Sequence, residues 1–121
     1  MLFRSGLQDK SNPPFTDGKL FTSLQPVHEK ISLFRVSGLT VNTVSGNEQT
    51  IKLRMERCGC SVESMEGAAF HYVCLHENVP FAQIRAISNY VTPRDKSQWK
   101  MKEAIINLND WLLDFIGKLP F

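Results

Sequence analysis

The side chains best suited to chemistry lie in three polar segments, residues 45–48, 63–67 and 88–94. Each segment follows a run of residues that is typical of a β-strand, and in open α/β sheets ligands bind beyond the carboxyl ends of the strands. Glu66 supplies a carboxylate, which can accept two hydrogen bonds from neighbouring hydroxyl groups. Asn89 supplies an amide, which donates and accepts hydrogen bonds at once. The sequence therefore predicts a ligand site at one edge of a sheet.

The strands that would position these segments are indicated by alternating, β-branched runs. Residues 39–44 form one such run and residues 81–88 another, and a short strand is expected to end at Val62. Between them, helical patterns cover residues 48–57, with a stop near Gly59, and residues 65–77. This alternation predicts an α/β chain with a mostly parallel central sheet.

The two ends of the chain differ in character. Turn-forming residues crowd the N-terminal part, so residues 6–30 are expected to be an irregular loop region. At the other end, a helix is expected to begin near residue 99 or 102 and to end at Ile116. Its apolar side chains recur on one face of the helix, which is the amphipathic pattern of a helix packed against a core.

Composition excludes several classes of protein. The 121 residues suit one small domain, and 42% apolar and 21% charged residues are ordinary for a globular protein. With a net charge of +2 and no basic face, the chain has no positively charged surface that would bind a nucleic acid. No apolar run approaches the roughly 20 residues that span a bilayer, and the start lacks the apolar core of a signal peptide. We therefore expect a cytoplasmic protein with no membrane partner.

The three cysteines, Cys58, Cys60 and Cys74, predict neither a disulfide framework nor a metal site. An odd number of cysteines in an enzyme-like chain favours reduced thiols. The spacing of Cys58 and Cys60 is too short for a typical zinc pair, and no second pair of ligands follows. No metal and no cofactor are therefore expected.

Four motifs occur in order along the chain, and together they carry a resemblance. They are Pro-Phe-Thr-Asp-Gly from residue 14, Asn-Thr-Val-Ser-Gly from residue 42, Val-Glu-Ser-Met-Glu-Gly-Ala-Ala from residue 62, and Val-Pro-Phe from residue 79 followed by Ile-Arg-Ala-Ile-Ser-Asn from residue 84. This series resembles the purine nucleoside phosphorylase and nucleosidase superfamily, and within it most closely the futalosine hydrolases of menaquinone biosynthesis. The resemblance covers nearly the whole chain after residue 6.

The resemblance implies a fold, a domain organisation and an assembly. Residues 1–121 would be the C-terminal portion, about half, of a single nucleosidase domain with a three-layer α/β/α fold. The absent half would supply the carboxylate that activates the attacking water. Residues 1–5 match what a sequencing adapter encodes, so we expect a non-native start. The family also implies a homo-oligomer in the full-length protein. Half of a parallel sheet would expose a hydrogen-bonding edge and an apolar face, so we expect the chain by itself to be poorly stable and inactive.

The resemblance also assigns roles to individual residues. Glu66 would hold the 2′- and 3′-hydroxyls of ribose and favour the cationic transition state, with Met65 packing under the sugar and Ser64 beside it. Asn89, assisted by Ser88, suits hypoxanthine because a 6-oxopurine presents an acceptor where adenine presents a donor. Two further contacts are implied at the purine and at the 5′ substituent, by Ser45 with Gly46 and by Phe15.

Alternatives remain open beside this interpretation. Glu66 and Met65 would also suit a helix start and a core, Asn89 a turn, and Phe15 a loop anchor. Within the enzymes, a methylthioadenosine/S-adenosylhomocysteine nucleosidase or a purine nucleoside phosphorylase is the next candidate. From a different class, the chain could belong to a non-catalytic nucleoside-binding module, which would bind without releasing the base.

Overall fold

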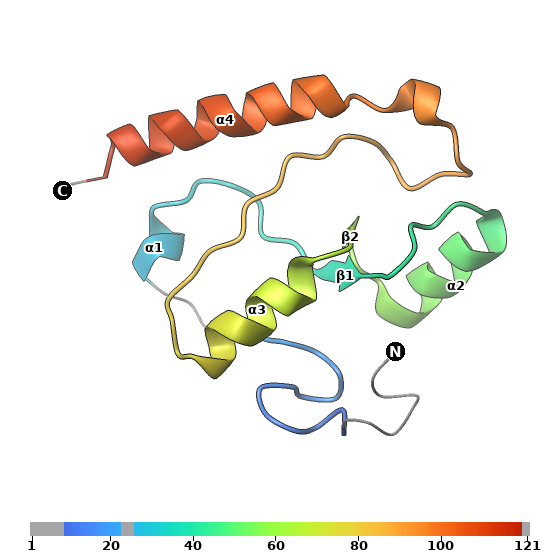
Figure 1. Ribbon diagram of the computed structural model, residues 1–121, viewed down its shortest axis with the longest axis horizontal. Helices are drawn as coiled ribbons and strands as arrows, with labels where there is room; N and C mark the ends of the chain where they lie inside the picture. Colours follow the sequence, from blue (N-terminus) through green and yellow to red (C-terminus); the bar gives the residue numbers. More distant parts are fainter. Residues whose placement is uncertain (1–8, 23–25, 120–121) are drawn as a thin grey trace. The chain divides into compact units, whose positions relative to one another are not determined.

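The computed structural model describes residues 9–22 and 26–119 (Figure 1). Residues 1–5, expected to be a non-native start, lie outside the described part. In chain order the elements are α1 (Pro26–Glu29), β1 (Gly38–Thr40), α2 (Glu48–Cys58), β2 (Val62–Ser64), α3 (Gly67–His76), the 3₁₀-helix η1 (Lys96–Gln98) and α4 (Met101–Gly117). They divide between two compact units, one of residues 1–44 and 60–83, the other of residues 45–59 and 84–121.

The sheet of the first unit consists of β1 and β2, which pair in parallel with Gly38 opposite Val62 and Thr40 opposite Ser64. Val41, just after β1, extends the pairing by donating its N–H to the Ser64 carbonyl at 2.8 Å. The chain passes through α2 between the two strands and through α3 directly after β2. A helical connection between parallel strands is the defining unit of an α/β fold, so the predicted fold class is confirmed.

Helix α3 packs its aromatic side chains within the same unit. Phe81, which is buried, lies edge-on to His71 and Phe70 with ring centroids 4.8 and 5.5 Å away. His71 lies 3.0 Å from the Gly67 carbonyl through Nδ1, and Nε2 of His28 lies 3.0 Å from the carbonyl oxygen of Phe81. Both histidines therefore have partners within the first unit.

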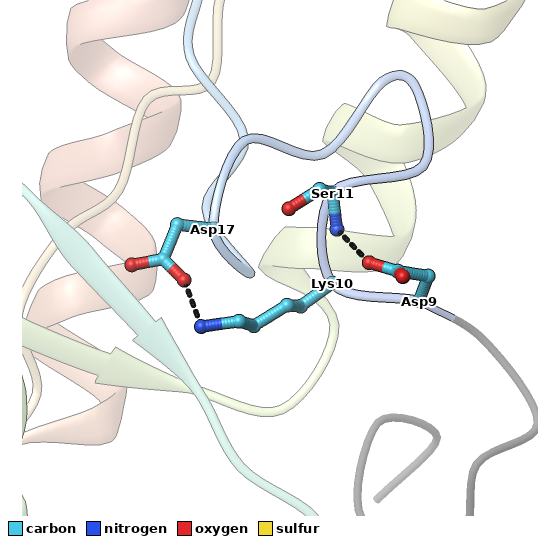
Figure 2. Close-up of polar contacts among 4 residues, drawn as sticks. All are labelled: Asp9, Lys10, Ser11 and Asp17. Carbon is cyan, nitrogen blue, oxygen red and sulfur yellow. Dashed lines mark hydrogen bonds and ion pairs between the residues drawn. The ribbon is translucent and has the colours of Figure 1, made fainter.

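Residues 9–19 form a compact loop in the first unit, part of which Figure 2 shows. Lys10 and Asp17 form an ion pair across it, and the Ser11 N–H donates to Oδ1 of Asp9 at 2.8 Å. The hydrogen bond and the charge of Lys10 lower the pKa of Asp17, and those of Asp17 raise the pKa of Lys10. Asp17 and Gly18 have φ of 48° and 74°, so the reversal uses an acidic residue and a glycine, two of the types that tolerate the left-handed region.

The second unit contains α2, which is capped at both ends. The Asn47 side chain accepts from the Thr50 N–H at 2.9 Å, and the Gly59 N–H donates to the Met55 carbonyl with Gly59 at φ 59°. An Asn N-cap and a left-handed Gly after the last turn are the preferred residues at these positions. The predicted helix over residues 48–57 with a stop near Gly59 is thus confirmed to within one residue.

Helix α4 spans the predicted residues, but its apolar stripe is only partly buried, so the expected packing of that face against a core is wrong for several of its side chains. Trp111 and Phe115 stack on one face with centroids 5.0 Å apart and ring planes at 10°, and Ala104 on the same side is buried. Large apolar side chains on the neighbouring face are exposed, among them Ile105, Leu112 and Ile116. No helix among the described residues is long and apolar enough to cross a bilayer.

The strands depart from the prediction. Residues 81–88 do not form a strand, and β1 has three residues where six were expected. Backbone groups of the 81–88 run bond elsewhere, because the Phe81 carbonyl accepts from His28 and the Ser88 carbonyl accepts from the Lys100 N–H at 2.8 Å. An alternating run becomes a strand only when a partner strand takes these groups, and the sequence pattern does not show whether one is present.

Smaller boundary predictions also fail. The strand expected to end at Val62 instead begins there, and the helix expected from Met65 begins at Gly67. The N-terminal region contains one helical turn, α1.

Cys58 and Cys60 are disulfide-bonded and only Cys74 is free, so reduced thiols were the wrong expectation for two of the three cysteines. The number of cysteines does not show how close two of them lie. Here Gly59, in the left-handed conformation, turns the chain between Cys58 and Cys60.

Candidate active site

The junction between β2 and α3 places Ser64, Met65 and Glu66 at the carboxyl edge of the parallel pair (Figure 1). Ser64 is the last residue of β2 and is half-buried, whereas Met65 and Glu66 are exposed. Because β1 and β2 run parallel, their carboxyl ends share one edge, and Thr40 lies opposite Ser64 there. The carboxyl edge of this strand pair, with Ser64 at it, therefore lies within the first unit.

Glu66 is the N-cap residue of α3 by position, but its carboxylate does not cap the helix. Its backbone carbonyl accepts the first helical hydrogen bond, from the Phe70 N–H at 3.2 Å. The Ala68 N–H, one of the amides without a partner inside the helix, donates instead to Oγ1 of Thr40 at 2.8 Å. The carboxylate of Glu66 has no hydrogen-bond or ion-pair partner among the described residues. It is thus exposed and uncommitted beside a helix N-terminus, where the helix dipole favours negative charge.

Phe15 lies in the same unit, where its ring is 5.5 Å from that of Tyr72 on α3 and tilted by 33°. Tyr72 in turn stacks on His76, with centroids 5.9 Å apart. The first motif and the helix that follows Glu66 are therefore in contact. This contact is the one expected if Phe15 anchors its loop, and the contact to the 5′ substituent stays a prediction.

The second unit holds Ser45 and Gly46, at the turn before α2. Ser45 is buried at 8% exposure, and its Oγ accepts from Arg54 on α2 at 2.6 Å. The Gly46 carbonyl accepts from the Arg94 N–H at 3.2 Å, and a Cβ added to Gly46 would lie 3.7 Å from Cβ of Arg94. The turn is therefore fixed by two arginines that the sequence patterns did not single out.

Ser88 and Asn89 also lie in the second unit, in the irregular run before η1. The Ser88 hydroxyl donates to Oδ1 of Asn89 at 2.7 Å, and Nδ2 of Asn89 donates to the Tyr90 carbonyl at 3.0 Å. An amide has two N–H donors and two acceptor lone pairs. One of each is occupied, so Asn89 keeps one donor and one acceptor for a ligand.

The candidate residues thus form two groups. Ser64, Met65, Glu66 and Phe15 belong to the first unit, and Ser45, Gly46, Ser88 and Asn89 to the second. Sequence reasoning missed Thr40, whose contact with Ala68 spans 28 positions and leaves no local signal. Within the described residues, no three His, Cys, Asp or Glu side chains lie together in a group that could hold a metal ion.

Comparison with known proteins decides the family. A family model described as the phosphorylase superfamily matches residues 3–116. The chain belongs to the phosphorylase superfamily. This match confirms the resemblance that the four motifs carry. Together with the parallel pairing of β1 and β2, it also confirms the predicted α/β class.

Within the phosphorylase superfamily, three relatives named futalosine hydrolase match this chain. The protein of Thermus thermophilus is 44% identical over 68 residues, covering 56% of this chain and 30% of the relative. The proteins of Streptomyces coelicolor and Acidothermus cellulolyticus are 38% and 34% identical, covering 67% and 58% of this chain and 33% and 29% of the relatives. The chain therefore spans about a third of the length of these relatives. No solved structure matches it significantly.

Proposed function

We propose that this chain carries the ribose-holding and base-holding residues of a futalosine hydrolase, an enzyme that uses water to cleave the N-glycosidic bond between hypoxanthine and ribose. The three relatives with that name support the substrate, and the exposed, uncommitted carboxylate of Glu66 is the observation that carries the chemistry. The product would enter menaquinone biosynthesis. We also propose a cytoplasmic homo-oligomer, following the family resemblance.

The reaction requires two kinds of stabilisation. As the bond to the base breaks, positive charge develops on the ribose, and a carboxylate held near the 2′- and 3′-hydroxyls stabilises that charge electrostatically. Glu66 would accept hydrogen bonds from both hydroxyls, and Met65 would pack under the sugar ring. The water oxygen then bonds to C1′, and its proton is taken up by a carboxylate outside this chain.

The leaving base requires a complementary partner. Hypoxanthine departs as a neutral base when N9 keeps the electron pair of the broken bond and N7 takes up a proton from solvent water, so its edge then presents the N7–H donor next to the O6 acceptor. The free acceptor and the free donor of Asn89 match this edge. Adenine protonated at N7 would present two donors, which suit a carboxylate and leave one N–H of Asn89 without an acceptor.

Base release tests the proposal directly. We would replace the matching third of the Thermus thermophilus relative with residues of this chain, and offer the chimaera futalosine and methylthioadenosine side by side. Hypoxanthine from futalosine is the expected product. Adenine from methylthioadenosine would preserve the role of Glu66 but contradict the proposed substrate, and binding without release of either base would favour a non-catalytic module.

Glu66→Gln in the same chimaera tests the ribose contact. Removing the charge while keeping one acceptor loses a charge-assisted bond worth about 1.5–3 kcal/mol, so kcat/KM should fall roughly 10- to 150-fold. Glu77→Gln is the matched control, because Glu77 is an exposed carboxylate at the opposite end of α3 that pairs with the adjacent His76. Equal activity in both variants would remove Glu66 from the mechanism.

A further inference from the structure

The start of α3 is capped by a residue from another element. The first amides of a helix lack partners within the helix, and they are usually satisfied by the side chain of the N-cap residue. At α3 that residue is Glu66, and its side chain does not bond to them. The Ala68 N–H instead donates to the hydroxyl of Thr40, 28 positions earlier in the chain, at 2.8 Å in a half-buried setting.

The β1–β2 pairing fixes where this hydroxyl lies. Thr40 is opposite Ser64 in the parallel register, and the adjacent Val41 N–H is bonded to the Ser64 carbonyl at 2.8 Å. Ser64 is separated from the first residue of α3 only by Met65 and Glu66. The same strand pair therefore holds both the hydroxyl of Thr40 and the beginning of the helix that it caps.

A carboxylate at an N-cap position has two competing uses. It can fold back onto the amides of the first turn, where the helix dipole favours it, or it can face outward to a ligand. Thr40 removes the competition at Ala68, since the amide is already satisfied. We propose that Thr40 is a positioning residue: by capping α3 from β1, it leaves the carboxylate of Glu66 available to the vicinal hydroxyls of a ribonucleoside. This inference rests on the proposed function for the ligand, but not for the capping.

Amide exchange in the 121-residue chain tests the capping without any ligand. Thr40→Val keeps the shape and the strand preference of the residue but removes the hydroxyl, so the Ala68 amide should exchange about fivefold faster, the effect of losing one N-cap bond. Thr40→Ser restores the hydroxyl and should return the rate to that of the unchanged chain. Amides of α2, which has its own caps, serve as the internal reference.

Nucleoside binding tests the consequence for Glu66. The probes are inosine and 2′-deoxyinosine, which differ by one of the two hydroxyls, and their binding to the chimaera is followed through the amide signals of Gly67 and Ala68. The unchanged chimaera and its Thr40→Ser variant should prefer inosine, and Glu66→Gln should abolish the preference. Thr40→Val should reduce the preference by about tenfold, the effect of losing one charge-assisted hydrogen bond, because the carboxylate turns to the unsatisfied amide.

The outcomes separate the two ideas. An unchanged Ala68 exchange rate in Thr40→Val would overturn the capping, and an unchanged preference for inosine in that variant would overturn the positioning role while the Glu66→Gln result upholds the proposed function. If the unchanged chimaera does not distinguish the two nucleosides, the ribose role of Glu66 is refuted and the positioning role with it. Faster exchange together with reduced preference, both rescued by Thr40→Ser, supports the inference.

Discussion

Asn89→Asp is the substitution that tests the base assignment most directly. In the structure, Oδ1 of Asn89 accepts from Ser88 and Nδ2 donates to the Tyr90 carbonyl at 3.0 Å. An aspartate keeps the first bond but places an acceptor against the Tyr90 carbonyl. Tyr90 is 88% exposed, so water can replace the lost donor, and we expect the fold to lose only about 1 kcal/mol, the net worth of one hydrogen bond.

The effect on the leaving base should be larger. An ionised aspartate offers only acceptors, so the O6 acceptor of hypoxanthine loses its donor and faces a like partner. Leaving such a group unsatisfied costs about 1–3 kcal/mol, which lowers kcat/KM for futalosine roughly 5- to 150-fold at pH 7. Because an ordinary aspartate has a pKa of about 3.9, part of this loss should be recovered as the pH falls toward 4 and the carboxyl regains a proton to donate.

The assay is base release by the chimaera, with futalosine and methylthioadenosine each measured across pH. Adenine release should rise in Asn89→Asp, because two acceptors suit the two donors of adenine protonated at N7. Asn89→Ala is the control, since it removes all hydrogen bonding and should impair both substrates. The argument from donors and acceptors is refuted if Asn89→Asp cleaves futalosine as fast as the unchanged protein. It is also refuted if Asn89→Ala cleaves both substrates as fast as the unchanged protein.

Three further predictions concern the described structure. Asn47→Ala should destabilise α2 by about 1 kcal/mol, the usual cost of losing an N-cap, as measured by helical circular dichroism in denaturant, whereas Gln49→Ala in the first turn should not. Gly59→Ala should cost about 1–2 kcal/mol because φ is 59° there and a Cβ is strained in that region whatever the space; the same denaturation measurement checks it. The hydroxyl and backbone N–H of Ser97 lower the pKa of Asp95, so the cap of η1 is complete above the ordinary aspartate pKa of about 3.9 and is lost as the pH falls through the lowered value. The Ser97 amide shift should follow that titration, and Ser97→Ala, which removes the first-named cause, should move its midpoint upward.

The helices could be predicted from sequence because their signals are local. Asn47 and Gly59 lie at the ends of α2, within hydrogen-bonding reach of the turns that they cap, and the stripe that includes Trp111 and Phe115 repeats within α4. The strands could not be bounded in the same way. Whether residues 81–88 pair depends on a partner strand elsewhere in the chain, and in the structure His28 and Lys100 bond the backbone groups that a partner would take.

The two groups of candidate residues differ in how much of their position could be predicted from local sequence patterns. The order of strand, polar residues and helix placed Ser64 and Glu66 at the carboxyl edge correctly, and only the residue that leaves the carboxylate uncommitted, Thr40, was beyond a local pattern. Asn89 lies instead directly after the run where the predicted strand did not form, and among the described residues its side chain bonds to the neighbouring Ser88 and Tyr90. Its assignment to the base therefore rests on the donor and acceptor that these bonds leave free. The substitution that exchanges that donor for an acceptor is consequently more informative about the substrate than any change at Glu66, because every purine ribonucleoside presents the same two hydroxyls.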